Sequence, residues 1–316
     1  MTDMTTDIHG RGGRTTVSTE CLSCRIRKDE YILSLGSCFS TEIGIRLADD
    51  GYRTMNNPFG VLYNPFSIAR AIDFLAESHI FTEADVIPRD TNPQRRRQRQ
   101  DTDNTDGSTS RHRPIAPEGG GYVSFFHHGS FARRTPEEFL KNANESLKEA
   151  SAWFGKASRI IVTFGTAWVY RHTGRNIIVS NCHKHPAQEF RREIMDIDSI
   201  TASWVRTVNR FPEKHFIFTV SPIRHKKDGL HGNQISKAIL LLAADRIIRQ
   251  ADNQNASYFP AYEIVLDELR DYSWFTEDLV HPSPAAIDIV WQRFRSTALS
   301  DTTLSLPVGH YSATRR

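Results

Sequence analysis

Cysteine is scarce in this sequence, with only four among 316 residues. A chain of this length in which 39% of the residues are hydrophobic can bury a large core, so it does not need disulfides to fold. The four residues, Cys21, Cys24, Cys38 and Cys182, are expected to be thiols in a reducing compartment. Cys21 and Cys24 have the spacing of half a zinc site, which Cys182 and His183 could complete. Because a single pair at this spacing is weak evidence, we predict no metal site and no other cofactor.

A large net charge and a long hydrophobic run are also absent. The 40 basic and 37 acidic residues leave a formal charge of +3, which gives no field strong enough to attract nucleic acid or an anionic membrane. The first 20 residues are polar and lack the apolar core of a secretory signal, and no later segment is long and apolar enough to span a bilayer. We therefore expect a cytoplasmic protein without a nucleic-acid or membrane partner.

Hydrophobic residues are few between residues 88 and 121. The basic run Arg95–Arg99 in this segment is followed by three aspartates and has no interleaved aromatic residues, so it lacks the pattern of a nucleic-acid-binding segment. We interpret residues 88–121 as a disordered or mobile insertion. The chain then divides into a polar leader, residues 1–28, one globular domain, residues 29–300, and a tail, residues 301–316.

The most informative stretch is residues 31–51. Its apolar run Tyr31–Leu35 is typical of a buried strand, Gly36 permits an unusual backbone angle, and the residues that follow have helical spacing. Ser40 or Thr41 is predicted to cap that helix. Residues between such a strand and such a helix lie in the crevice at the carboxyl end of a sheet, where the helix N-terminus stabilises negative charge.

Ser37 and Cys38 occupy this turn. A hydroxyl or a thiol in such a place can act as a nucleophile if a base lies beside it. The alternative interpretation is structural, because a cysteine outside a disulfide is commonly a small buried hydrophobe and a serine is an ordinary turn residue. A base contributed by a distant part of the chain would favour the catalytic interpretation.

Two Asp-x-x-His sequences could supply that base. Asp228 and His231 form the first, and Asp278 and His281 form the second, on a loop that leads into an apolar helical pattern. At this spacing the carboxylate can orient the imidazole while the imidazole removes a proton from a nucleophile elsewhere. The spacing alone leaves both pairs open.

A loop at the end of the predicted second strand, residues 56–65, contains two Pro, three Asn and one Gly. This composition excludes regular structure, and Gly60 would let a backbone N–H group approach a substrate closely. A structural Asn-Pro turn explains the same pattern equally well. Another predicted strand ends at Gly165, and a hairpin beyond it would carry the polar cluster Asn181–Pro186 over the same crevice.

Alternation of strands with helices predicts a three-layer α/β/α sandwich with a five-stranded, mainly parallel sheet. The hairpin lies outside the sheet. The predicted strands are 31–35, 52–55, 159–166, 215–221 and 257–266; the predicted helices are 40–51, 67–76, 136–154, 236–249 and a last one after residue 283; and the hairpin strands are 168–170 and 176–180.

With these motifs in order, the chain resembles the GSCFA-domain family, a branch of the SGNH (GDSL-type) hydrolase superfamily. The resemblance covers nearly the whole chain, and its motifs are specific as a set. They are Gly36–Ser40, Asn57–Pro65, Phe164–Tyr170, Asn181–Lys184, Ser221–His225, His231–Gln234 and Asp278–Ser283. The chain departs from the family pattern in having Ser40 where the family name has Ala, and in the length and polarity of its insertion.

The resemblance implies a flavodoxin-like SGNH fold and acyl-ester chemistry at the carboxyl ends of the strands. In the superfamily the nucleophile lies two residues after the Gly that ends the strand, an offset that selects Cys38 rather than Ser37. The order of elements also favours the later acid–base pair, because only the final helix follows His281. The resemblance therefore implies that His281 is the base and that Asp278 orients it.

The same resemblance raises a question about the oxyanion hole. The superfamily has an Asn shortly after the Gly of its third block, whereas Gly165 is followed by Thr166. Asn57 or Asn181 could replace that side chain, together with backbone N–H groups such as those of Cys38 and Gly60. The motifs add three predicted substrate-binding residues, which are His183, Arg224 and His231.

These inferences predict a hydrolase or acyltransferase that acts on an ester or thioester. The substrate would be a small-molecule or carbohydrate ester, an acyl thioester could be the donor, and the acceptor would be water or a sugar hydroxyl. The alternative is a non-catalytic module on the same fold that binds a carbohydrate or a protein partner, which the missing Asn of the third block suggests.

Overall fold

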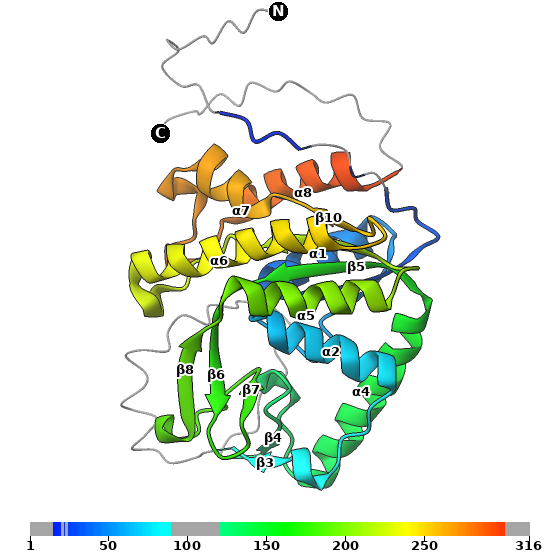
Figure 1. Ribbon diagram of the computed structural model, residues 1–316, viewed down its shortest axis with the longest axis vertical. Helices are drawn as coiled ribbons and strands as arrows, with labels where there is room; N and C mark the ends of the chain where they lie inside the picture. The colour runs from blue at the N-terminus through cyan, green and yellow to red at the C-terminus, as the bar shows by residue number, and fades with distance from the viewer. Residues whose placement is uncertain (1–14, 20–21, 23–24, 90–119, 301–316) are drawn as a thin grey trace, which may run out of the picture.

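The computed structural model describes residues 15–19, 22, 25–89 and 120–300 (Figure 1). Cys21, Cys24, and most of the predicted leader, insertion and tail lie outside these residues. Among the helices of the described ranges, none combines the length and the apolar character needed to cross a lipid bilayer.

The described residues contain one central parallel sheet. Its strands are β1 (Tyr31–Gly36), β2 (Arg53–Asn56), β5 (Ala157–Phe164), β9 (His215–Val220) and β10 (Ala256–Tyr258). The five strands lie in the order β10-β9-β5-β1-β2, and every neighbouring pair is parallel. Counted along the chain, this order is 2-1-3-4-5, the order of flavodoxin-like folds. The predicted five-stranded parallel sheet is confirmed.

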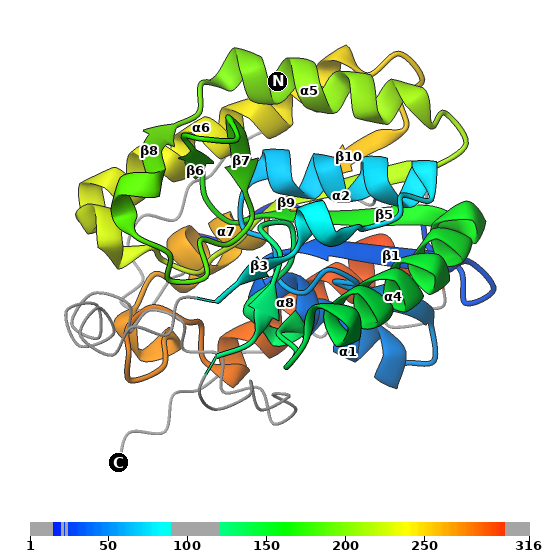
Figure 2. The same cartoon turned by 90° about the horizontal axis from the view of Figure 1, so that it is seen from below.

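Helices cover both faces of the sheet, as Figures 1 and 2 show. On one face lie α1 (Cys38–Asp49), α7 (Ala261–Glu263) and α8 (Pro284–Ala298); on the other lie α2 (Pro65–Glu77), α4 (Pro136–Lys156), α5 (Ile197–Arg210) and α6 (Gly229–Gln250). Alternate strand residues point to opposite faces of the sheet. Ile161 therefore packs in the core on the side of α1 and α8, and Val162 packs in the core on the side of α2, α4, α5 and α6. The predicted α/β/α sandwich is therefore correct, although α5 was not predicted.

A smaller antiparallel sheet follows the carboxyl end of β5, at the lower left of Figure 1. It consists of β6 (Trp168–His172), β7 (Ile177–Val179) and β8 (Phe190–Ile194), in the order β7-β6-β8. The predicted hairpin corresponds to β6 and β7, whereas β8 was not predicted. Two short strands, β3 (Ile87–Pro88) and β4 (Tyr122–Val123), pair at the ends of the predicted insertion.

The predicted start of the first helix was wrong. Neither Ser40 nor Thr41 caps it, because α1 begins at Cys38 and Ser37 is its N-cap residue. The Ser40 hydroxyl lies 2.7 Å from that of Ser34, and Thr41 accepts a hydrogen bond from the Asn57 side chain. The correction places Cys38 at the first helical position, where the helix dipole acts most strongly.

The predicted fifth strand, 257–266, was too long. β10 ends at Tyr258, and Pro260 follows it at the start of helical structure that continues to Leu269. Proline has no N–H group to donate to a strand ladder, and its fixed backbone angle suits the first turn of a helix. The apolar residues that suggested a strand are buried beside α8 instead, because short apolar runs do not distinguish a buried strand from a buried helix.

Gly36 allows the chain to turn sharply between β1 and α1. Its φ angle is +139°, and a Cβ atom there would lie 2.2 Å from the carbonyl oxygen of Thr163 on the neighbouring strand. Its N–H donates to the Asn57 side chain at 2.8 Å, and its carbonyl accepts from the backbone N–H of Leu62 at 2.9 Å. The turn therefore requires glycine and connects β1 to the loop after β2.

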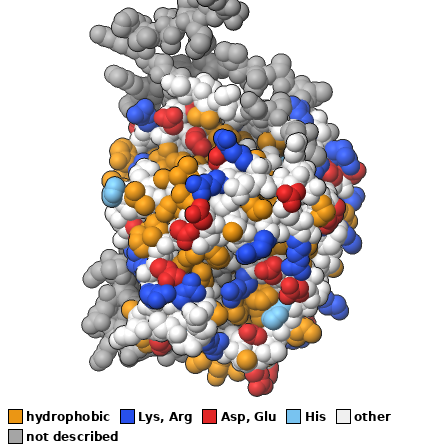
Figure 3. All heavy atoms as spheres, viewed as in Figure 1, with side chains coloured by type: hydrophobic (Ala, Val, Ile, Leu, Met, Phe, Trp, Pro, Cys, Tyr) orange, Lys and Arg blue, Asp and Glu red, His pale blue; other side chains and the backbone are white. Residues whose placement is uncertain are grey.

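The surface in Figure 3 carries acidic and basic side chains interspersed over the face shown, in agreement with the small net charge of the chain. No large area of one sign is present on that face.

We expect Gly36→Ala to lower the free energy of unfolding by at least about 3 kcal/mol, because it adds backbone strain to a clash with Thr163. The matched control is Gly155→Ala in α4, where a Cβ atom would meet nothing within 4 Å. This control should raise stability by up to about 1 kcal/mol. Urea denaturation measures both, and similar midpoints for the two variants would contradict the role of the turn.

Candidate active site

Cys38 and Ser37 lie at the carboxyl end of β1, but the structure places them differently. Ser37 is 1% exposed, and its backbone N–H donates to Thr163. Its hydroxyl does not cap α1 and is buried without a hydrogen-bond partner among the described residues. Cys38 is partly exposed. Accessibility therefore favours Cys38 as the residue that can meet a substrate.

Asp278 and His281 form a hydrogen-bonded pair in the loop before α8. Asp278 Oδ2 lies 2.6 Å from His281 Nδ1, and Oδ1 accepts hydrogen bonds from the backbone N–H groups of Val280 and His281. The Thr276 hydroxyl donates to the same oxygen at 2.7 Å. Leu279, between the pair, has a φ angle of +55°, which lets the loop fold around the carboxylate. The predicted pairing of these two residues is present in the structure.

The charge of Asp278 determines the tautomer of His281. Burial raises the pKa of this carboxyl group, but hydrogen bonds from Thr276 and from the side chain and backbone of His281 outweigh that effect and hold it well below its usual range. Asp278 is therefore ionised and acts only as an acceptor, so His281 Nδ1 carries a proton. In the neutral imidazole the lone pair then lies on Nε2.

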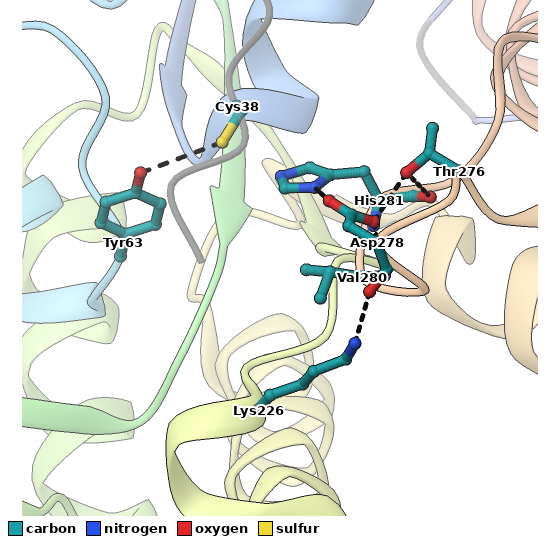
Figure 4. Close-up of polar contacts among 7 residues, drawn as sticks. All are labelled: Cys38, Tyr63, Lys226, Thr276, Asp278, Val280 and His281. Carbon is teal, nitrogen blue, oxygen red and sulfur yellow. Dashed lines mark hydrogen bonds and ion pairs between the residues drawn. The ribbon is translucent and has the colours of Figure 1, made fainter. Parts of the chain in front are cut away.

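The imidazole of His281 extends from its loop toward Cys38, with Asp278 on the far side of the ring (Figure 4). Tyr63 approaches Cys38 from the opposite direction, and its hydroxyl oxygen lies 3.9 Å from the sulfur. The fold therefore brings together three segments of the chain, and the outermost two residues, Cys38 and His281, are more than 200 residues apart in the sequence. A thiol, an imidazole and a carboxylate are the kinds of group that nucleophilic catalysis combines.

The other Asp-x-x-His pair does not form. Asp228 makes an ion pair with Arg192 of β8, and its side chain is only 4% exposed. His231 lies exposed on the first turns of α6. The structure thus distinguishes two pairs that have the same spacing in the sequence.

Asn57 and Gly60 lie in the loop beside the turn, but their polar groups hold the loop together. The Asn57 side chain accepts from Gly36 and donates to Thr41 at 2.9 Å. The N–H group of Gly60 donates to the carbonyl oxygen of Asn57 at 2.7 Å. The Gly60 N–H group is therefore engaged within the loop. Of the two interpretations of this loop, the structural Asn-Pro turn fits the contacts better than a substrate-binding loop.

Gly165 and Thr166 lie at the end of β5, and both of their N–H groups donate to the carbonyl oxygen of Tyr63, at 2.8 and 3.0 Å. The Thr166 hydroxyl lies 3.1 Å from that of Ser236 on α6. These two residues attach the Tyr63 loop to the central sheet. Their N–H groups do not point to an empty oxyanion position.

Asn181 and His183 belong to a different part of the described structure. Asn181 accepts a hydrogen bond from the His183 backbone, and the His183 imidazole donates to the carbonyl oxygen of Ser124, beside β4. Burial lowers the pKa of His183 to about 3, so the ring is neutral. These contacts hold the two residues against the segment next to β4, and the placement of the cluster over the crevice stays a prediction.

Arg224 holds the loop that carries His281. Its backbone N–H donates to the carbonyl oxygen of Val280 at 3.2 Å. Its guanidinium carbon lies 4.1 Å from the centre of the Phe275 ring and 5.0 Å from that of Tyr272. Lys226 adds a hydrogen bond to the carbonyl oxygen of Asp278. The contacts of Arg224 therefore position the acid–base pair.

His225 lies near the pair but was not predicted as a site residue. Its ring packs edge-on against the ring of Tyr63, with centroids 6.1 Å apart and planes at 88°. Burial lowers its pKa to about 3, and the positive charges of Lys237 and His281 contribute to that shift. The signal that could have found it is its position in the Ser221–His225 motif, directly after a buried strand.

Lys237 was also missed. It lies on α6 with 1% exposure, and its Nζ atom donates to the carbonyl oxygens of Gly165 and Ser221, each at 2.7 Å. These carbonyls end β5 and β9, so one ammonium group links two neighbouring strand ends. Burial lowers the pKa of Lys237 to about 7. Its spacing from Leu240, on the buried face of the helix, was the available signal.

We expect the buried position of Lys237 to give the protein a measurable pH dependence. Between pH 7 and about 10 the unfolded chain holds a proton on this lysine that the folded chain has lost, so stability should rise with pH by up to about 1.4 kcal/mol per unit. Lys237→Met should remove this rise, whereas Lys148→Met, at an exposed position on α4, should keep it. Urea titrations at several pH values compare the three proteins. Parallel curves for wild type and Lys237→Met would contradict the assignment.

The described residues contain no group of three or more His, Cys, Asp or Glu side chains arranged to hold a metal ion.

The family model that matches is the GSCFA family, over residues 31–294. No curated protein and no solved structure matches the chain significantly. The matched segment runs from the first residue of β1 to the last turn of α8, and so includes Cys38, Tyr63 and the Asp278–His281 pair. The chain belongs to the GSCFA family.

Proposed function

We propose that this protein is an acyl-transfer enzyme of the SGNH hydrolase type, a hydrolase or an acyltransferase, in which Cys38 is the nucleophile. The observation that supports the proposal best is the hydrogen-bonded Asp278–His281 pair, whose imidazole extends toward Cys38. The position of Cys38 at the first residue of α1 adds the helix dipole, which stabilises a thiolate.

The first half of the reaction transfers the acyl group to the protein. His281 Nε2 takes the proton of the Cys38 thiol, and the thiolate sulfur forms a bond to the acyl carbon of an ester or thioester. The carbonyl electron pair moves to oxygen and returns as the bond to the leaving group breaks. The imidazolium then gives its proton to the departing alkoxide or thiolate, while Asp278 stabilises the positive charge on the ring.

The second half releases the acyl group. His281 takes a proton from water or from an acceptor hydroxyl, whose oxygen forms the new bond to the acyl carbon. The bond to Cys38 breaks and the thiolate regains a proton from the imidazolium. With water the product is a carboxylic acid, and with a sugar hydroxyl it is a new ester.

The proposed substrates are small-molecule or carbohydrate esters, which can reach the partly exposed thiol, and an acyl thioester is a further possible donor. A thiol nucleophile works only while it is reduced, which fits a cytoplasmic protein.

One observation favours a second candidate function, a non-catalytic binding module. The N–H groups of Gly60, Gly165 and Thr166 are all engaged in hydrogen bonds within the protein. If no other group stabilises an oxyanion, the same fold could bind an ester or a sugar without turning it over.

We expect the acyl group of a p-nitrophenyl ester to be found on Cys38 when the acyl-enzyme is trapped and analysed by mass spectrometry. Iodoacetamide should label Cys38 before the other three cysteines and should inactivate the protein. Cys38→Ala should be inactive, Cys38→Ser should be a slow hydrolase, and Ser37→Ala should keep measurable activity. An acyl adduct on Ser37 in Cys38→Ala would restore a serine mechanism, and ligand binding without any adduct would favour the binding module.

The acid–base pair generates a separate prediction. His281→Ala should abolish turnover, and Asp278→Asn should lower kcat by about 10⁴-fold because an amide favours the wrong imidazole tautomer. His231→Ala, in the Asp-x-x-His sequence that does not pair, is the matched control and should keep the wild-type chemical rate. Steady-state kinetics measures all three. Equal losses of kcat in His231→Ala and His281→Ala would show that the wrong base has been chosen.

A further inference from the structure

Acyl transfer of the kind proposed above needs a hydrogen-bond donor for the negative oxygen of the tetrahedral intermediate. The sequence offered the N–H groups of Cys38 and Gly60 for this role, and that of Gly60 donates to a carbonyl oxygen of the protein, as do those of the nearby Gly165 and Thr166. The Asn181 side chain accepts from the backbone N–H of His183, whose ring binds Ser124 beside β4, and Asn57 is held in its own loop. None of these side chains supplies a donor beside the sulfur.

Tyr63 is the side chain whose hydroxyl approaches the nucleophile. Its Oη atom lies 3.9 Å from the Cys38 sulfur, and in Figure 4 it faces Cys38 from the side opposite His281. An acyl carbon bonded to the sulfur carries its oxygen one bond further out. A hydroxyl at this distance from the sulfur can therefore reach that oxygen, while the base on the other side remains free to move protons.

The position of Tyr63 is held from several directions. Its carbonyl oxygen accepts the N–H groups of Gly165 and Thr166, which attaches the residue to the end of β5. The preceding residue, Leu62, donates its N–H to Gly36 at 2.9 Å. The following residue, Asn64, caps α2 by accepting from the Ser67 N–H at 2.8 Å. The hydroxyl is thus part of a fixed framework, as a preorganised oxyanion donor must be.

His225 fixes the ring itself. Its imidazole packs edge-on against the Tyr63 ring, with the two planes nearly perpendicular. The His225 backbone N–H is in turn held by the Asn233 side chain at 2.9 Å. The Tyr63 ring therefore has limited freedom to swing away from Cys38.

We propose that the Tyr63 hydroxyl is the side-chain oxyanion donor of this site, in place of the asparagine that is absent after Gly165. The assignment rests on the proposed acyl transfer. When the Cys38 thiolate forms its bond to the acyl carbon, the carbonyl electron pair moves to oxygen, and Tyr63 donates a hydrogen bond to that oxygen without transferring its proton. When the leaving group departs, the electron pair returns to the carbonyl and the hydrogen bond weakens. Gly165 and Thr166, which follow β5, are positioning residues, because their N–H groups hold Tyr63 in place.

The test is Tyr63→Phe, which removes only the hydroxyl and keeps the ring that packs against His225. The matched control is Tyr31→Phe, at the opposite end of β1, where the ring contacts Trp153. Two rates are measured for each protein: acylation of Cys38 by a p-nitrophenyl ester, and alkylation of Cys38 by iodoacetamide. Alkylation requires the thiolate but forms no oxyanion, so it separates the donor role from a structural one.

We expect Tyr63→Phe to lower the acylation rate by about 10²-fold or more while alkylation stays within about twofold of wild type. Tyr31→Phe should change neither rate. As a second measurement, a trifluoromethyl ketone, which forms a tetrahedral adduct on a thiolate, should bind Tyr63→Phe more weakly by a similar factor.

Three results would overturn the assignment. Unchanged acylation in Tyr63→Phe would exclude the hydroxyl as a donor. Equal losses of acylation and alkylation would show that Tyr63 acts on the thiolate or on the fold. If the wild-type protein forms no acyl adduct at all, the proposed function fails, and the role of Tyr63 fails with it. If wild type and Tyr63→Phe are acylated at the same rate, only the role of Tyr63 is rejected.

Discussion

The hydrogen bonds around the Gly36 turn are the constraint on which the rest of the site depends. Gly36 donates to Asn57 and accepts from Leu62, and Ser37 donates to Thr163 on β5. Three segments that follow different strands are thereby joined at one point. Because a side chain at residue 36 would strike Thr163, the close approach of β1 and β5 and the start of α1 at Cys38 both require a glycine here.

Polar groups near the site are used mainly to hold loops, and this determines which atoms remain available for chemistry. The N–H groups at the end of β5 hold Tyr63, and Lys237 holds the carbonyl oxygens of Gly165 and Ser221. The loop of His281 is held through Arg224 and through the carboxylate of Asp278. The N–H groups of Gly60, Gly165 and Thr166 are thus engaged within the protein, and the groups that face Cys38 in Figure 4 are the side chains of Tyr63 and His281.

The electrostatic surroundings of His281 and His225 agree with the roles proposed for them. Hydrogen bonds from three N–H or O–H groups keep Asp278 ionised, so the proton of the pair resides on His281 Nδ1 and the opposite nitrogen can act as a base. Burial and nearby positive charge keep His225 neutral, which suits a packing role against Tyr63 rather than proton transfer. The surroundings of the two histidines thus suit them to different roles in the proposed reaction.

The sequence by itself determined the layer architecture, the parallel sheet and the Gly36 turn, because these depend on periodicity and on glycine. It did not determine where β10 ends, since a buried strand and a buried helix have the same apolar pattern. The Asp-x-x-His spacing did not separate Asp278 and His281 from Asp228 and His231, and only the family resemblance favoured the later pair; in the structure Asp228 binds Arg192 instead. Which N–H groups are engaged, and that Tyr63 and His225 lie at the site, were decided only by the tertiary structure, because hydrogen bonds between loops depend on which strand ends become neighbours in the sheet.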